Sequence, residues 1–249
     1  SGTWHSHILE AEAKSSHYHL TAQISGGITA AGGWLGMLQH LENRGKKPFT
    51  LVGAASLKIT SSDNFSVENL RLNIGEGQLT VKRFIKKYTH LETDGSASHI
   101  PLNWLLSLSQ TTDATIDSSL TIGGEWSVRA DHAVNGALHF YREDGDITLI
   151  GEENRFRFRL TGLDANAQFN NNNMNVRLKA SSRRLGETDV LFKSRLSRRQ
   201  GSWGLFKDSP IQLSIKSDMP SIGWLNFLTG QPDMDISGSL MAHVNGSGT

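Results

Sequence analysis

The stretch Arg155-Phe-Arg-Phe-Arg-Leu160 alternates strictly between apolar and charged side chains. Successive side chains of a β-strand point to opposite faces, so Phe156, Phe158 and Leu160 would share one face and the three arginines the other. The stretch therefore predicts a half-buried strand with one apolar and one polar face.

The same alternation recurs along the chain. We count about sixteen such segments, spaced near the 8–12 residues that are typical of an all-β fold. Turn signals such as Asn135-Gly136 and Asp144-Gly145 separate them. The alternating apolar residues include Leu20, Ala22 and Ile24; Leu51, Ala55, Leu57 and Ile59; Leu70, Leu72 and Ile74; Ile116, Leu120 and Ile122; Leu138 and Phe140; Ile147 and Leu149; Met174, Val176 and Leu178; Val190, Phe192 and Leu196; Ile211, Leu213 and Ile215; and Ile236, Leu240, Ala242 and Val244.

Composition narrows the classes of protein. The 249 residues carry 25 Lys+Arg and 24 Asp+Glu, so bulk charge predicts no nucleic-acid partner. Cysteine is absent, which excludes disulfides, thiolate zinc sites and thiol nucleophiles. The longest apolar stretches, such as Ile100–Leu106, fall far below the roughly 18 residues of a membrane helix. Because the chain opens with Ser1-Gly2 and no Met, we expect an internal segment of a longer protein, organised as one elongated β domain over residues 1–249.

Three segments break the two-residue period and share the pattern Trp-Leu-x-x-Leu. This spacing predicts a short helix with its apolar residues on one side. The tryptophans lie 70 and then 120 residues apart, which argues against the fixed unit of a propeller or solenoid. Such helices either fill the end of a sheet or cap a groove. The residues in question are Trp34 and Leu38, Trp104 and Leu108, and Trp224 and Leu228.

The C-terminal stretch runs Asp235-Ile-Ser-Gly-Ser-Leu-Met-Ala-His-Val-Asn-Gly-Ser-Gly-Thr249. It resembles a repeated motif of the TamB family of Gram-negative bacteria. Members repeat a strand, a short x-W-L helix and a strand of the form D-x-x-G-x-L-x-A-x-V-x-G-x-x-G-T. A weaker copy follows Trp104, where Asp117, Ser119 and Leu120 stand for the aspartate, glycine and leucine at a shorter spacing than in the motif. In the C-terminal copy the matching residues are Asp235, Gly238, Leu240, Ala242, Val244 and Gly246, and the final pair Gly248 and Thr249 follows one residue earlier than in the motif.

The resemblance implies a fold and a function. Its fold would be an elongated, curled antiparallel or mixed sheet that forms a half-pipe (a β-taco) with an apolar groove. TamB proteins are anchored in the inner membrane, cross the periplasm and pair with the outer-membrane barrel TamA. They are linked to phospholipid transport, protein secretion and outer-membrane biogenesis. The resemblance therefore implies a periplasmic segment of an inner-to-outer-membrane bridge, with phospholipid as its ligand.

A physical argument is compatible with that function. Each acyl CH₂ exposed to water costs about 0.8 kcal/mol, so a chain of ~16 carbons faces a penalty above 10 kcal/mol. A continuous apolar face removes this barrier without covalent chemistry. We therefore expect a protein that is not an enzyme and that has no cofactor or metal. The residues that we expect to line the groove are Leu70, Leu72, Phe156, Phe158, Met174, Val176, Ile211, Leu213, Ile236 and Leu240.

Other candidate sites have simpler interpretations. His5 and His7, with His17 and His19, have the spacing of metal ligands on strands, but the alternation puts the second pair on the polar face. The arginine clusters, such as Arg183-Arg184, suit either phosphate binding or a solvated sheet face. No nucleophile-elbow signature occurs, and Asp233 and Asp235 are typical of a turn before a strand.

Alternation by itself leaves rival folds open. A closed β-sandwich, such as a carbohydrate-binding or protein-interaction module, buries one face of each sheet in the same way. An outer-membrane barrel would need aromatic girdles at both ends of its strands, whereas the tryptophans here lie in the segments that break the strand period.

Overall fold

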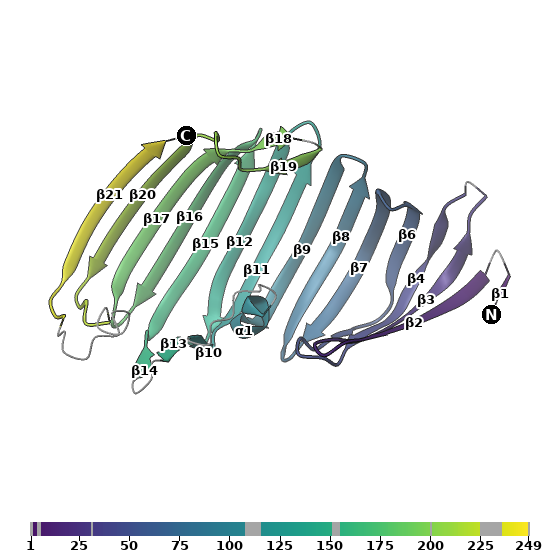
Figure 1. Ribbon diagram of the computed structural model, residues 1–249, viewed down its shortest axis with the longest axis horizontal. Helices are drawn as coiled ribbons and strands as arrows, with labels where there is room; N and C mark the ends of the chain where they lie inside the picture. Colours follow the sequence, from purple (N-terminus) through teal and green to yellow (C-terminus); the bar gives the residue numbers. More distant parts are fainter. Residues whose placement is uncertain are drawn as a thin grey trace. The chain divides into compact units, whose positions relative to one another are not determined.

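The computed structural model describes residues 2–3, 6–30, 32–107, 116–150, 155–199, 201–224 and 236–248. Within these ranges the fold is all-β, as the alternation predicted, with one five-residue helix, α1 (Leu102–Leu106). The main sheet has sixteen described strands, and every pairing register found for it is antiparallel. Strands that are neighbours in the sheet are mostly neighbours in the chain as well (Figure 1).

The chain divides into two compact units. The first unit holds residues 1–100 and 125–136, and the second holds residues 101–124 and 137–249. The strands β11 (Thr121–Ala130) and β12 (Val134–Asp144) therefore contribute residues to both units. The single-domain organisation expected from the sequence stays a prediction.

The first unit is a run of hairpins. Its hydrogen-bonded order is β1-β2-β3-β4-β5-β7-β8-β9, and β6 pairs with both β4 and β7. The strands are β1 (Gly2–Thr3), β2 (Ser6–Lys14), β3 (His19–Ile28), β4 (Trp34–Asn43), β5 (Phe49–Leu51), β6 (Ala55–Ser61), β7 (Asn64–Ile74), β8 (Gly77–Lys87) and β9 (His90–Pro101).

In the second unit the main-sheet order β12-β15-β16-β17-β20-β21 is again sequential. Two small sheets accompany it: β10-β13-β14 and the hairpin β18-β19. The strands are β10 (Ile116–Ser118), β13 (Ile147–Ile150), β14 (Arg155–Arg157), β15 (Leu160–Asn170), β16 (Asn173–Ser182), β17 (Gly186–Arg195), β18 (Ser197–Arg199), β19 (Ser202–Gly204), β20 (Ile211–Met219) and β21 (Leu240–Gly248).

Burial is sparse for a protein of this length. Among the described apolar residues, six are buried: Ala55, Ile74, Ile100, Leu120, Ala130 and Val134. Only Leu120 of these belongs to the second unit. A sheet that packs face to face on another sheet would bury most of its inward residues. The described strands of each unit therefore lack the buried apolar layer of a sandwich.

The first predicted Trp-Leu helix is wrong. Trp34 and Leu38 lie in strand β4, where they pair with Ile28 and Ile24 of β3. A spacing of four is a multiple of two, so the two side chains share a face of a strand as well as of a helix. The indole of Trp34 covers two glycines: a Cβ atom at Gly26 or Gly36 would lie 2.7 Å from its Cζ2.

The second predicted helix is confirmed as α1, which contains Trp104. For the third, Gly223 and Trp224 lie in a turn and the following residues lie outside the described ranges. Leu108 and Leu228 also lie outside them. The strand expected over Ile116, Leu120 and Ile122 is interrupted: β10 pairs with β13, and β11 begins in the main sheet at Thr121.

Candidate functional site

One face of the second unit's main sheet is apolar across five adjacent strands. The pairing registers place Leu178 of β16 opposite Val190 of β17, and Val176 opposite Phe192. Continued through the neighbouring strands, these pairs form two cross-strand rows. The rows are Ala165-Leu178-Val190-Ile215-Val244 and Ala167-Val176-Phe192-Leu213-Gly246. We call this surface, with the flanking Met174, Ile211 and Leu240, the apolar face.

The apolar face is not covered by another layer of described residues. None of its large side chains is buried, and Leu178, Ile211 and Leu240 are 37%, 39% and 42% exposed. Val244 on the edge strand β21 is 54% exposed. The sheet therefore presents a broad apolar surface that is partly open to solvent.

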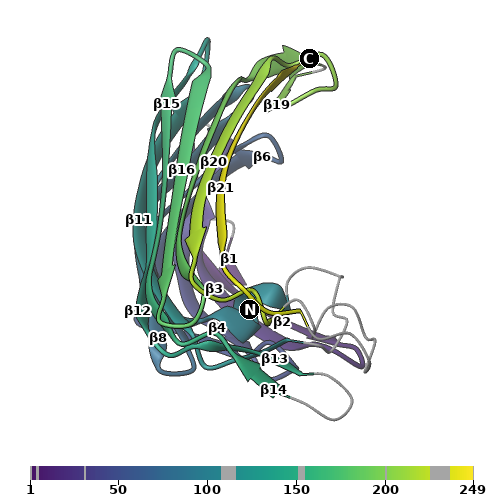
Figure 2. The same cartoon turned by 90° about the vertical axis from the view of Figure 1, so that its left-hand side faces the viewer.

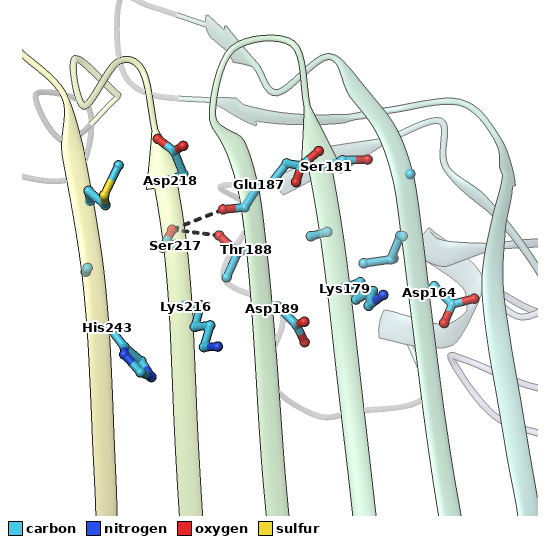
Figure 3. A pocket seen from close by; sticks show the side chains of 15 residues that line it. Asp164, Lys179, Ser181, Glu187, Thr188, Asp189, Lys216, Ser217, Asp218 and His243 are labelled. Atoms are coloured by element: carbon cyan, nitrogen blue, oxygen red, sulfur yellow. Dashed lines mark hydrogen bonds between the residues drawn. The ribbon is translucent and has the colours of Figure 1, made fainter.

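The opposite face of the same strands is charged. Figure 3 shows Asp164, Lys179, Asp189, Lys216 and His243 side by side on it, around a depression of about 720 Å³. Arg177 forms a two-point ion pair with Asp189, at 3.0 Å and 2.5 Å. This pair lowers the pKa of Asp189 and raises that of Arg177. Alternating charge of this kind is what a solvated sheet face requires.

The strands that carry the two faces are curved. In Figure 2, β15, β16, β20 and β21 bend along their length in the same sense, and α1 lies on the inner side of the bend. In Figure 3, which looks onto the charged face, α1 lies behind the sheet. The apolar face is therefore the concave face of this unit and the charged face the convex one.

The first unit has an apolar face of its own. Leu70 and Leu72 of β7 pair with Val81 and Leu79 of β8, and all four side chains are partly exposed. Farther along the same two strands, the rings of Phe65 and Phe84 stack at 5.7 Å.

Tryptophans cover glycines on this face. The indole of Trp126 covers Gly95 and donates its Nε1–H to Thr93 Oγ1 at 3.0 Å. Trp34, over Gly26 and Gly36, donates to His7 Nε2 at 2.9 Å. In both cases an indole fills the space that a glycine leaves on the sheet, and its N–H donates to a side chain of another strand.

Phe156 and Phe158 do not lie on the main sheet, so the single strand predicted over Arg155–Leu160 is wrong. Strand β14 ends at Arg157 and pairs with β13 in the small sheet, where Phe156 faces Leu149. Arg159 has a φ of 57°, and β15 begins only at Leu160. The two phenylalanine rings meet edge to face at 5.5 Å.

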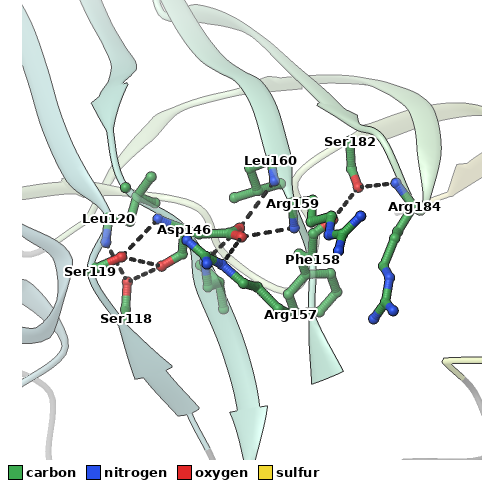
Figure 4. A network of polar contacts seen from close by, with 12 residues as sticks. Ser118, Ser119, Leu120, Asp146, Arg157, Phe158, Arg159, Leu160, Ser182 and Arg184 are labelled. Atoms are coloured by element: carbon green, nitrogen blue, oxygen red, sulfur yellow. Dashed lines mark hydrogen bonds and ion pairs between the residues drawn. The ribbon is translucent and has the colours of Figure 1, made fainter. Parts of the chain in front are cut away.

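A buried carboxylate causes this interruption (Figure 4). Asp146 Oδ2 accepts the backbone N–H of Arg159 at 2.9 Å and Nε–H of Arg157 at 2.8 Å. Its Oδ1 accepts the backbone N–H of Leu160 at 3.0 Å and of Ile147 at 2.9 Å. The chain is thus turned at Arg159 instead of continuing as a strand, and residue 146 was not singled out by sequence reasoning.

The Asp146 side chain is only 6% exposed, and its backbone is held as well. Ser119 Oγ accepts the Asp146 N–H at 3.1 Å, and the Asp146 carbonyl accepts the Ser119 N–H at 3.0 Å. Burial raises the pKa of this carboxyl, but the hydrogen bonds from Leu160, Ile147 and Arg157 outweigh it, so the pKa is lowered. Asp146 therefore carries its negative charge in the folded protein at neutral pH.

The tryptophans of the other two Trp-Leu segments differ from Trp34. Among the described residues, the Nε1 atoms of Trp104 and Trp224 are buried and have no hydrogen-bond partner, as is the case for Trp203 in β19. Their indoles are therefore held by packing. The capping role expected for these residues stays a prediction.

His5 lies outside the described ranges, and the described histidines His7 and His19 do not converge. His7 shares the face of Trp34, to which it is hydrogen-bonded, whereas His19 pairs with Glu12 at 2.8 Å on the opposite face. Within the described ranges, no three metal-ligating side chains cluster. Asp233 and Asp235 lie outside them, and Ile236 lies within them before β21.

Among the described residues, no helix is long enough and apolar enough to cross a membrane, since α1 has only five residues. Comparison with known proteins gives no match to a family model, a curated protein or a solved structure. The resemblance to the TamB family accordingly stays a prediction that rests on the residues quoted above.

Proposed function

We propose that this chain is a periplasmic segment of a TamB-like bridge that shelters phospholipid acyl chains on its apolar face. Its longer parent would be anchored in the inner membrane and would meet TamA through parts outside this segment. The observation that carries the proposal is the half-exposed apolar surface over five adjacent strands of the second unit.

Exposed apolar area costs about 25 cal/mol for each Å² in contact with water. Soluble proteins rarely expose apolar patches of this extent, and those that do usually use them as binding surfaces. A hydrocarbon chain suits such a surface because it needs no directional hydrogen bonds. The concave curvature of the strands increases the contact that a flexible chain can make.

The rival sandwich module receives less support. Two packed sheets would bury residues such as Phe192 and Ile215 between them, but both are partly exposed. No metal cluster within the described ranges points to catalysis, and the apolar face carries no charged residue in its two central rows.

Photo-crosslinking tests the direction of the proposed binding. A photoreactive amino acid is placed at Val176, Phe192 or Leu213 of the apolar face in the full chain, which is then incubated with phospholipid vesicles. The matched controls carry it at the sequence neighbours Arg177, Lys193 and Gln212 of the charged face. We expect lipid adducts, detected by mass spectrometry, at the first three positions and only background at the other three.

Equal labelling of both faces would contradict the proposal, because the alternation would then have no directional meaning. Adducts to polypeptide in place of lipid, in cells that express the labelled chain, would point to a polypeptide cargo and would equally overturn it.

A further inference from the structure

At one end of the second unit, four arginines surround a depression of about 560 Å³. It lies where β15 begins and β16 ends, and Leu160, Thr161 and Gly145 complete its lining. Two aspartates, Asp144 and Asp146, also line it. The arginines are Arg142, Arg157, Arg159 and Arg183, so positive charge prevails.

The two aspartates do not neutralise this excess. Asp146 is turned inward, and both of its oxygens are taken up by backbone N–H groups and by Arg157. The Arg142 guanidinium lies 3.7 Å from Asp144 and donates its Nε–H to the carbonyl of Gly145 at 3.0 Å. Within the described residues, the guanidinium groups of Arg159 and Arg183 pair with no carboxylate, and both residues are exposed.

The backbone holds these two arginines together. The Arg183 N–H donates to the Arg159 carbonyl at 3.1 Å, while the Arg159 N–H donates to Asp146. Both side chains therefore leave adjacent points of a fixed backbone. Guanidinium groups arranged in this way bind phosphate oxygens by paired, charge-assisted hydrogen bonds.

Apolar groups lie directly beside the arginines. Phe156 lies under the guanidinium of Arg184 at 5.0 Å and against Phe158. Leu160 lines the depression, and the same strand, β15, continues into the apolar face with Leu163, Ala165 and Ala167. A cationic depression at the end of an apolar surface matches the two parts of an anionic amphiphile.

We propose that Arg159 and Arg183 bind the phosphate of a phospholipid head group at this end of the apolar face. This inference rests on the proposed function, since it assigns the head group of the same lipid whose chains lie on that face. Arg142 and Arg157 contribute positive charge, and they are already oriented by Gly145 and Asp146.

The test is a binding measurement with two fluorescent lipids of identical acyl chains, phosphatidylglycerol and uncharged diacylglycerol. It compares the full chain with R159Q/R183Q and with a control of equal charge change, R195Q/R198Q, at exposed arginines of β17 and β18. Both substitutions at the depression leave the backbone hydrogen bonds of residues 159 and 183 in place. Circular dichroism confirms that each variant is folded.

We expect R159Q/R183Q to weaken phosphatidylglycerol binding at least about 10-fold while diacylglycerol binding is unchanged, since two charge-assisted hydrogen-bond donors are lost. The control pair should change neither. Equal effects of R159Q/R183Q on both lipids, or no effect on either, would overturn the head-group site and leave the proposed function standing.

Binding of neither lipid by the unaltered chain would overturn the proposed function together with this inference. In that case, titration with inorganic phosphate identifies a free anion as the ligand if R159Q/R183Q abolishes its binding. If the head-group site exists, we expect inorganic phosphate to compete with phosphatidylglycerol for binding and not with diacylglycerol.

Discussion

Two stretches with the same alternation have different structures. Met174, Val176 and Leu178 alternate with Asn175 and Arg177 in the first half of strand β16, which is paired on both sides. The stretch Arg155–Leu160 alternates more strictly, yet it is broken at Arg159 and divided between two sheets. Alternation therefore predicts local strand geometry, whereas a partner elsewhere in the chain decides whether the strand continues.

The two regions also differ in what stabilises them. Side chains of the apolar face are partly exposed, so each contributes only part of the free energy of a buried side chain. At Asp146, a single buried carboxylate satisfies four donors from residues 147, 157, 159 and 160. We therefore expect substitutions at Asp146 to cost far more free energy of unfolding than substitutions on the apolar face.

Asp146→Asn is the largest expected effect. An asparagine keeps the shape of the side chain but removes the charge and presents N–H donors to groups that already donate. We expect a loss of about 3 kcal/mol in the free energy of unfolding, measured by urea denaturation. Asp144→Asn, two residues away with its side chain 88% exposed, is the control and should cost less than about 0.5 kcal/mol.

The pH dependence of the free energy of unfolding, compared between the unaltered chain and Asp146→Asn, gives a second readout. Although burial raises the pKa of Asp146, its hydrogen bonds lower the pKa below the unfolded value of about 3.9. Its stabilisation is thus complete above about pH 4 and is lost as the pH falls through the folded pKa. The stability difference between the unaltered chain and Asp146→Asn should shrink in acid, and a constant difference would contradict this account.

Val176→Ala tests the stability of the apolar face. Because Val176 is partly exposed, we expect a loss of about 1 kcal/mol, about half that of a fully buried valine. Arg177→Ala, on the charged face, removes an ion pair whose partners are 52% and 32% exposed and should cost less still. A loss at Val176 as large as that at Asp146 would indicate that the apolar face is covered in solution.

Arg159→Gly has the smallest expected effect on the free energy of unfolding, and the sign of that effect is what tests the break at Arg159. With a φ of 57°, Arg159 adopts a left-handed conformation that glycine adopts without strain. We expect no loss or a gain of about 0.5 kcal/mol. Arg177→Gly, in a regular strand with the same alternation, should lose about 1 kcal/mol. If both variants lose stability equally, the break in the Arg155–Leu160 stretch is absent in solution.

The Trp-Leu segments show a similar limit of local patterns. The spacing of Trp34 and Leu38 fits the period of a strand as well as that of a helix. The segment forms a strand, in which Gly26 and Gly36 leave room for the indole on the sheet. The same motif at Trp104 does form a helix, α1, directly after Pro101. Within the five-residue motif the two copies differ at the third residue, which is Gly36 in the strand and Leu106 in the helix.

The amino-acid sequence by itself determined the all-β fold and the residues that share each face, because side-chain direction in a strand depends only on a two-residue period. Leu70 with Leu72, Met174 with Val176, and Ile211 with Leu213 are together for that reason. Tertiary structure alone decided where the strands end and which groups meet at Asp146. Those outcomes depend on hydrogen bonds between residues far apart in the chain, to which a local pattern contributes no information.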